Sequence, residues 1–200
     1  MSDPQTPVAT SVFPSALGWF AIQGTERGLT FLTFGHPTEE AARATLPTTS
    51  PPTAKSIAPP DWMKAAETSL QDYARGLPVN PGEIIPLDIR HRTPFEARVR
   101  EKLLRLGYGQ TMSYGELAEA AGKPRAARAV GSIMAKNPIP LVIPCHRVLG
   151  AGGRLGGYSA PSGLAMKTRL LQLESTSGDL PQQLFSKRAK RSGKRSPLRA

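Results

Sequence analysis

The octapeptide VIPCHRVL, residues 142–149, contains the only cysteine of the 200-residue chain, and a histidine follows it directly. A thiol near an imidazole could act as a nucleophile, because a base that removes the thiol proton produces the reactive thiolate. Free cysteine is also among the most buried residue types, so a structural role for Cys145 is the alternative. Adjacent side chains do not project side by side, and we therefore expect a bridging water between Cys145 and His146 instead of direct contact.

A carboxylate that could orient this base is predicted at Glu174. The segment GLAMKTRLLQLE, residues 163–174, has helical spacing, and Glu174 follows Leu170 by four residues and Leu171 by three. It therefore lies on or beside the apolar stripe of a helix, where a carboxylate needs a partner. The alternative is that the helix frays there and solvent covers Glu174. A thiol, a base and an orienting acid form the general scheme for activating a nucleophile.

Other chemistries find little support in the composition. One cysteine excludes an internal disulfide, and His36, His91 and His146 lie far apart, so that with Cys145 they match no closely spaced zinc-ligand pattern. We therefore expect no metal and no cofactor. The N-terminus lacks a basic start before an apolar run, and the longest apolar runs are too short to cross a bilayer. We expect neither a signal peptide nor a membrane partner.

The net charge of +11 is distributed unevenly. Residues 1–92 carry −2, residues 93–186 carry +6 and residues 187–200 carry +7. The basic character thus belongs to the second half of the chain, which suggests a polyanionic partner for that half. For residues 93–186 alone, a basic surface that only aids solubility is an equally good interpretation.

The segment that carries Cys145 should be irregular. Pro138, Pro140 and Pro144 forbid a helix interior or a central strand, so the apolar run between them is expected to be buried without regular structure. Pro144 can start a helical turn, which would expose Cys145 to free N–H groups and lower the pKa of its thiol. Downstream, the five glycines of residues 150–157 could allow a close approach to a ligand or form a floppy surface loop.

Two capping boxes predict helices upstream of the cysteine. Thr93 and Glu96, with proline at the first helical position, predict a helix that Gly107 stops. Ser113 and Glu116 predict a second helix, closed by Gly122. Tyr114 is thereby placed at a helix start.

The segment RAARAVGSIMAKN, residues 125–137, predicts the next helix after a short turn. Its apolar residues are expected to face inward, and a small, basic stripe lies on the other face. Two helices joined by so tight a turn resemble a helix-turn-helix, although a basic stripe is usually only a solvated face. The inward residues are Ala127, Val130, Ile133 and Met134, and the stripe consists of Arg125, Arg128, Ser132 and Lys136.

The first half of the chain predicts a small sheet with one helix. Residues 17–36 read as two strands around a turn at 24–28, and residues 46–60 as a linker rich in proline, serine and threonine. Asp61 is expected to cap a helix over 61–76 whose apolar face contains Trp62, Ala65, Ala66, Leu70 and Tyr73. An extended piece at 84–90 is expected to complete the sheet, and the tail to be disordered.

Several stretches together carry a family resemblance: NPIPLVIPCHRV, the preceding AARAVGSIMAKN, and the following GGY and LLQLE. They resemble the O6-alkylguanine-DNA alkyltransferases, closely over about residues 93–175, and the PCHR core is highly specific. Residues 17–36 are similar to the family's N-terminal domain. The resemblance implies a methylated-DNA–protein-cysteine S-methyltransferase, which flips O6-alkylguanine out of duplex DNA and moves the alkyl group irreversibly onto Cys145. Repair of O4-alkylthymine is a further candidate activity.

The resemblance also implies roles for single residues. Cys145 corresponds to the nucleophile, His146 to the water-linked base and Glu174 to the orienting acid. Asn137 corresponds to the asparagine that braces the cysteine segment, and Tyr114 to the tyrosine that assists flipping and protonates the leaving guanine.

Further positions correspond to the family's DNA and base contacts. Arg128 matches the residue that replaces the flipped base. The carbonyls of Cys145 and Val148 and the N–H of Ser159 match contacts to the guanine edge. The remaining implied positions are Arg125, Ala127, Ala129, Gly131 and Ser132 for DNA, and Tyr158 for the substrate.

The expected architecture is α/β (α+β). By resemblance, residues 1–92 form a ribonuclease H-like domain of a small sheet plus helix, and residues 93–175 a helical domain with a winged helix-turn-helix at about 113–136. Residues 176–200 would be a disordered basic tail. The partner is double-stranded DNA, bound through the minor groove by a monomer in the cytoplasm, on a bacterial nucleoid or in a eukaryotic nucleus.

Two features depart from the family pattern. The loop SAPSG after Tyr158 is slightly longer than in many relatives, which leaves the tolerated alkyl size open, and the basic tail is additional. The competing interpretation is a non-catalytic DNA-damage-binding module in which Cys145 is structural. A family branch of that kind lacks the cysteine, so Cys145 argues against it here. A cysteine hydrolase is a third alternative, with nothing that suggests a peptide groove.

Overall fold

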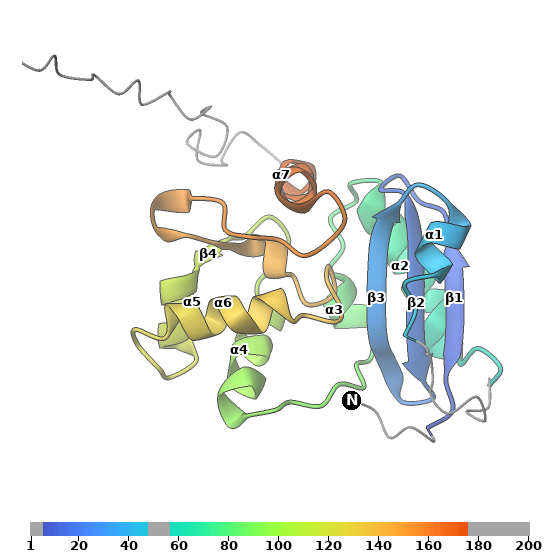
Figure 1. The fold of residues 1–200 in the computed structure, drawn as a ribbon, viewed down its shortest axis with the longest axis horizontal. Helices are drawn as coiled ribbons and strands as arrows, with labels where there is room; N and C mark the ends of the chain where they lie inside the picture. The colour runs from blue at the N-terminus through green and yellow to red at the C-terminus, as the bar shows by residue number, and fades with distance from the viewer. Residues whose placement is uncertain (1–5, 48–56, 176–200) are drawn as a thin grey trace, which may run out of the picture.

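The computed structural model describes residues 6–47 and 57–175, and Figure 1 shows how they are arranged. A three-stranded sheet and its helices form one side of the molecule, and a group of helices forms the other. The fold is therefore of mixed α and β type. Most of the predicted linker and the whole predicted tail, at 48–56 and 176–200, lie outside the described residues.

The sheet is antiparallel, in the order β1 (Ala9–Phe13), β2 (Trp19–Thr25) and β3 (Gly28–His36). The predicted hairpin at 17–36 is confirmed, whereas the edge strand β1 was not predicted. Nearly all of β2 is buried on both faces, as its apolar and aromatic residues require.

Two helices accompany the sheet: α1 (Glu39–Arg43), and α2 (Asp61–Ala74), which lies behind the sheet in Figure 1. The prediction that Asp61 caps α2 was wrong, because Pro60 occupies the cap and Asp61 is the first helical residue. The predicted apolar face is correct at its C-terminal end, where Leu70 and Tyr73 are fully buried. Ala65, however, is exposed.

The extended piece at 84–90 does not complete the sheet. The short helix α3 (Pro81–Ile84) takes up its start, and only one bridge, between Leu29 and Leu87, joins it to β3. Leu29 N–H donates to the carbonyl of Pro86, and Asp88 N–H donates to the carbonyl of Leu29. Pro86 has no N–H of its own, which prevents a longer ladder.

The second part of the chain opens with α4 (Pro94–Leu104) and α5 (Tyr114–Ala120). At α4 the hydroxyl of Thr93 accepts the Glu96 N–H, but the Glu96 carboxylate accepts the N–H of Arg92, so the predicted capping box is only half formed. At α5 the box of Ser113 and Glu116 is complete. Tyr114 is the first residue of α5, as predicted.

The helix predicted at 125–137 is shorter, α6 (Ala127–Ala135). Arg125 has a left-handed φ of 69° and precedes the helix, and Lys136 is its C-cap. The exposed basic stripe therefore keeps only Arg128 and Ser132 within the helix. Of the predicted inward residues, Val130 and Met134 are buried, while the remaining two, Ala127 and Ile133, are half-buried.

The elements around Cys145 are short. The 3-10 turn η1 (Cys145–Arg147) leads into β5 (Val148–Leu149), which pairs in parallel with β4 (Met112–Ser113). The 3-10 turn η2 (Ala151–Gly153) and the predicted helix α7 (Gly163–Glu174) follow. Because β4 runs directly into α5, the β4–β5 pair brings the start of α5 beside the cysteine segment.

Candidate active site

Asn137 holds the irregular segment that delivers Cys145. Its side-chain amide donates to the carbonyl of Ile143 at 2.8 Å and to the Cys145 sulfur at 3.3 Å. Its side-chain oxygen accepts the N–H of Ile139 at 3.2 Å. The proline-rich segment is not part of a helix or a sheet, so the hydrogen bonds from Asn137 take the place of regular backbone pairing and fix the loop.

Cys145 begins η1 and has only 4% of its surface exposed. The predicted helical turn after Pro144 is present, but the predicted lowering of the thiol pKa was wrong. Burial raises the pKa of Cys145, and the hydrogen bond from Asn137 and the charge of Lys167 offset this only in part. The thiol therefore needs a base during the reaction.

His146 and Glu174 form a buried pair, with Nε2 and Oε1 2.7 Å apart and almost no exposed surface on either side chain. In the described part of the chain, Nδ1 of His146 is buried and has no hydrogen-bond partner. Burial lowers the pKa of His146, although Glu174 favours its protonated form. The imidazole is thus kept neutral, with one nitrogen free to accept a proton.

Glu174 was predicted on the apolar side of its helix, and it is 1% exposed. Burial opposes ionisation of the carboxyl, but contacts from His146 and Arg147 outweigh it and lower its pKa to about 2. Arg147, which was not predicted, donates from Nε to Oε2 at 2.8 Å and from Nη2 to Oε1 at 2.9 Å. A charged residue inside the buried run IPCHRVL was the signal for it.

Lys167 is a second residue that sequence reasoning missed. It is completely buried, its Nζ donates to the carbonyl of Val148 at 2.6 Å, and it lies 5.9 Å from the centre of the Tyr114 ring. Burial lowers the pKa of Lys167 to about 8. Its position seven residues before Glu174, two turns along the same helix face, could have indicated it.

Tyr114 lies at the start of α5 against the glycine-rich loop. A Cβ atom at Gly156 would come within 2.7 Å of the Tyr114 hydroxyl, so the glycine allows the phenol its place. Burial raises the pKa of Tyr114, and the neighbouring Cys145 adds to the effect. The phenol therefore stays protonated at neutral pH and can donate a proton.

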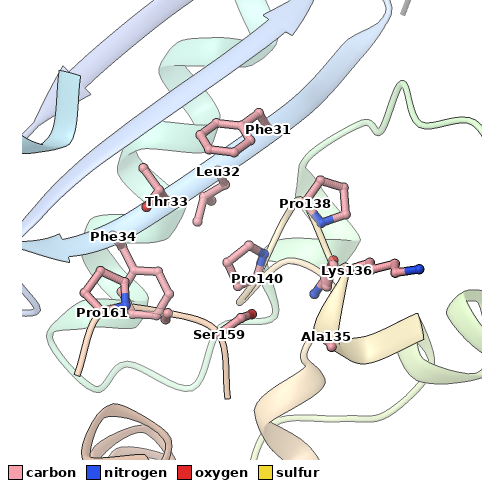
Figure 2. A pocket seen from close by; sticks show the side chains of 12 residues that line it. Phe31, Leu32, Thr33, Phe34, Ala135, Lys136, Pro138, Pro140, Ser159 and Pro161 are labelled. Atoms are coloured by element: carbon pink, nitrogen blue, oxygen red, sulfur yellow. The ribbon is translucent and has the colours of Figure 1, made fainter. Parts of the chain in front are cut away.

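The residues predicted to contact substrate lie around this loop. The carbonyl of Val148 already accepts a hydrogen bond from Lys167, Tyr158 has a buried hydroxyl without a partner among the described residues, and Ser159 is exposed. Ser159 also lines a cavity of about 340 Å³ that β3 walls on the other side. Figure 2 shows Ser159 and Pro140 beside this cavity, with Phe34 and Pro161 at one end.

The residues predicted to contact DNA lie on or just before α6. Arg128, Ala129 and Ser132 are exposed, and a Cβ atom at Gly131 would meet no neighbour within 4 Å. Two further predicted positions, Ala127 and Arg125, are half-buried and exposed, respectively. The C-terminus of α6 leads directly to Asn137, so this surface is continuous in sequence with the bracing residue.

Metal and membrane signals are absent from the described residues. Among residues 6–47 and 57–175, no group of three or more His, Cys, Asp or Glu side chains could hold a metal ion. None of the helices in the same part of the chain is both long and apolar enough to cross a membrane.

Comparison with known proteins gives matches over most of the chain. The family model of the 6-O-methylguanine DNA methyltransferase DNA-binding domain matches residues 94–176. A methylated-DNA–protein-cysteine methyltransferase of Methanosarcina acetivorans is 34% identical over 170 residues, which cover 83% of this chain and 97% of that protein. Its counterpart in Mycobacterium leprae is 54% identical over 82 residues, which cover 41% of this chain and 48% of that protein.

A solved structure extends the likeness to three dimensions. The crystal structure of Mycobacterium tuberculosis OGT in complex with DNA superposes with a TM-score of 0.62 and 35% sequence identity. The match covers 83% of this chain and 92% of that one, so both halves of the fold take part.

Proposed function

Because the chain belongs to the methylated-DNA–protein-cysteine methyltransferases, which repair DNA by moving an alkyl group onto a cysteine, we propose that Cys145 accepts the alkyl group of O6-alkylguanine in duplex DNA. The observation that carries this proposal is the chain's only cysteine, next to a buried His146–Glu174 pair. A structural cysteine would not need such a pair.

The reaction starts with removal of the thiol proton. His146 accepts this proton at Nδ1 through a bridging water, and Glu174 stabilises the imidazolium through Nε2. The thiolate then attacks the alkyl carbon, so that an S–C bond forms and the C–O6 bond breaks with its electron pair on guanine. Tyr114 donates a proton to a guanine ring nitrogen, which makes the base a better leaving group.

The thiol can reach the O6 substituent only when the nucleotide has left the base stack. We assign the DNA contacts to α6 in the minor groove, with Arg128 in the space that the flipped base leaves. Ala127, Ala129, Gly131 and Ser132 would lie against the backbone, with Arg125 beside them. The small side chains of the four helical positions, of which Ala129 and Ser132 are exposed, support a close approach of the helix.

Further parts of the proposal concern the guanine and the alkyl group. The base would be held by the carbonyls of Cys145 and Val148, by Tyr158 and by the N–H of Ser159. A thioether has no easy route back to a thiol, so each molecule acts once. O4-alkylthymine would be a second substrate of the same site.

The architecture completes the proposal. Residues 1–92 would form a ribonuclease H-like N-terminal domain, and residues 93–175 an alkyltransferase domain with a winged helix-turn-helix at about 113–136, with a basic tail beyond. The protein would act as a monomer in the compartment that holds its DNA, the nucleoid of a bacterium or the nucleus of a eukaryote.

Transfer of a labelled methyl group tests the proposed function. Duplex DNA with O6-[³H]methylguanine should label the chain once, on the peptide that contains Cys145. Cys145→Ser should abolish labelling and leave DNA binding nearly intact, because a hydroxyl is a far weaker nucleophile while the phosphate contacts are unchanged. Labelling of the serine variant near the parent rate, or more than one methyl group per molecule, would contradict the proposal.

A further inference from the structure

Tyr73 links the sheet-bearing part of the chain to the His146–Glu174 pair. It lies in the last turn of α2 with no exposed surface. Its hydroxyl donates to Glu174 Oε1 at 2.6 Å and lies 3.3 Å from His146 Nε2. Its ring stands edge-on to the imidazole, with ring centres 6.4 Å apart. The sequence separations are 101 and 73 residues, so only the tertiary structure creates this contact.

We infer that Tyr73 is a positioning residue for alkyl transfer: its hydroxyl holds Oε1 of Glu174 so that His146 keeps a proton on Nε2 and offers Nδ1 as the base. This inference rests on the proposed function of Cys145 and His146. It gives the N-terminal part of the chain a role in the chemistry of the C-terminal part.

The direction of each hydrogen bond follows from the groups themselves. An ionised carboxylate only accepts, so Tyr73 must donate to Glu174. Burial and the charge of Glu174 raise the pKa of Tyr73 well above its usual value, so the phenol keeps this proton. His146 Nε2 lies 2.7 Å from the same oxygen and must also carry a proton. Nδ1, the buried atom that has no partner among the described residues, is then the acceptor.

The same contact controls the basicity of His146. Donors on Glu174 draw charge away from the imidazole, so removal of the Tyr73 hydroxyl leaves more negative charge facing Nε2–H. An imidazolium is then better stabilised, and the pKa of His146 should rise from its lowered value. The titratable and charged groups around His146 are Glu174 and Lys167 on α7, Cys145 and Arg147 on η1, and Tyr73 on α2. Tyr108 packs edge-on against Tyr73, and Tyr158, whose hydroxyl is buried, interacts electrostatically with both Tyr73 and Glu174.

Tyr73→Phe isolates the hydroxyl because the ring and its packing remain. We expect the acid limb of the pH–rate profile, measured on saturating DNA, to shift by about one pH unit toward higher pH. At a given pH on that limb, this shift corresponds to about a tenfold lower transfer rate. A purely structural loss would lower stability without moving this limb.

Tyr108→Phe is the matched control. Its hydroxyl donates to the carbonyl of Leu173 at 2.9 Å, with the carbonyl of Gly76 at 3.4 Å, and among the described residues it makes no hydrogen bond to His146 or Glu174. It should lower the melting temperature and leave the pH profile in place. An equal shift of the pH profile in both variants would assign the effect to packing and overturn the inference.

A second readout needs no DNA. The chain has three histidines, so ¹⁵N spectra can follow the His146 imidazole in parent and variants. We expect the Nε2–H tautomer in the parent and a higher pKa in Tyr73→Phe. An unchanged His146 titration together with an unchanged pH profile would overturn the inference. If the parent itself fails to label Cys145, the proposed function fails, while the histidine spectra still test Tyr73.

Site-specific replacement of Tyr73 by 3-fluorotyrosine covers the case in which Tyr73→Phe does not fold. Fluorine makes the phenol a stronger donor, and the pKa of His146 should then move downward. A His146 titration that stays in place or moves upward would contradict the positioning role.

Discussion

Glu174 is the residue on which most contacts of the site converge. Oε1 accepts from Tyr73, His146 and Arg147, and Oε2 accepts from Arg147 and from the N–H of Gly109. These donors come from three separate segments of the chain, so the carboxylate has almost no freedom to turn. A buried charge held in this way fixes the imidazole beside it.

Arg128 is the single residue proposed to fill the space that the flipped base leaves. Arg128→Ala should reduce the transfer rate on saturating duplex DNA by on the order of tenfold or more, because a stacking gap costs a few kcal/mol when nothing fills it. The loss should be smaller on single strands and absent with free O6-alkylguanine base. Single-turnover rates on the three substrates measure the difference.

Arg105→Ala is the control for lost positive charge, since Arg105 is exposed at the C-terminal end of α4. It should change binding slightly and leave the saturated rate alone. If Arg128→Ala lowers the transfer rate by the same factor on duplex DNA and on free base, the substitution damages the thiol pocket. The gap-filling role of Arg128 would then be rejected.

At the scale of elements, the parallel pair of β4 and β5 brings the start of α5 beside the turn that carries the thiol. β4 continues into α5, which begins with Tyr114, while β5 continues the turn that begins with Cys145. The glycine-rich loop then passes over the Tyr114 hydroxyl. Small residues are needed there because the backbone itself packs against the phenol.

Gly156→Ala tests that packing. The added Cβ would lie 2.7 Å from the Tyr114 hydroxyl, so the phenol or the loop must shift. If Tyr114 supplies the proton, the saturated transfer rate should fall by up to about a hundredfold, the lower end of what a general acid contributes. Gly157→Ala, with nothing within 4 Å of its Cβ, should transfer at the parent rate. Equal transfer rates in the two variants would show that the packing of Gly156 against Tyr114 does not affect the reaction.

At the scale of the whole molecule, one hydrophobic core joins the sheet-bearing part to the helical part. Phe34 and Leu70 belong to the same buried cluster as Val99 and Leu103. The hydrogen bond from Tyr73 to Glu174 crosses between the two parts within this core. Loss of the Glu174 charge should therefore lower the free energy of unfolding of the whole molecule.

Stability should fall as the pH falls. The pKa of Glu174 is about 2 in the fold, against about 4.3 in an unfolded chain, so its stabilisation is complete above about pH 5 and is lost toward pH 2. That loss is on the order of 3 kcal/mol. His146 acts in the same direction, because burial lowers its pKa and an unfolded chain binds its proton first.

Urea unfolding at a series of pH values measures this dependence. Glu174→Gln should flatten the curve below pH 5, while the exposed Glu119→Gln should follow the parent. A parent stability that stays constant from pH 7 to pH 3 would show that neither buried group is linked to folding as described.

The seven positive charges of residues 187–200 should act on DNA encounter and not on chemistry. Each phosphate that they neutralise contributes up to about 0.9 to the slope of log affinity against log salt on duplex DNA. Truncation after residue 186 should make this slope shallower and leave the transfer rate at saturation unchanged. Titrations at several salt concentrations give the slope, and identical slopes would show that the tail does not contact DNA.

Local patterns in the sequence determined the reactive segment and the helices beside it. The prolines before Cys145 predicted an irregular run, and the capping box of Ser113 and Glu116 predicted the start of α5. The spacing of the leucines before Glu174 predicted that its side chain lies on the buried side of the helix. These signals succeed because they depend on neighbours within about one helical turn. They failed at Asp61, because the helix begins one residue earlier than the capping pattern indicates, and at residues 84–90, where strand pairing depends on a segment far away in the sequence.

Only the tertiary structure decided the electrostatics of the site. The burial that raises the pKa of Cys145 comes from the packing of several elements, and the contact of Tyr73 with Glu174 spans 101 residues. Lysine and arginine side chains usually stay exposed, yet Lys167 and Arg147 are both buried against the site, and the local sequence held only indirect signals for them. Desolvation and long-range hydrogen bonds depend on which surfaces the whole chain removes from water, and no local pattern contains that information.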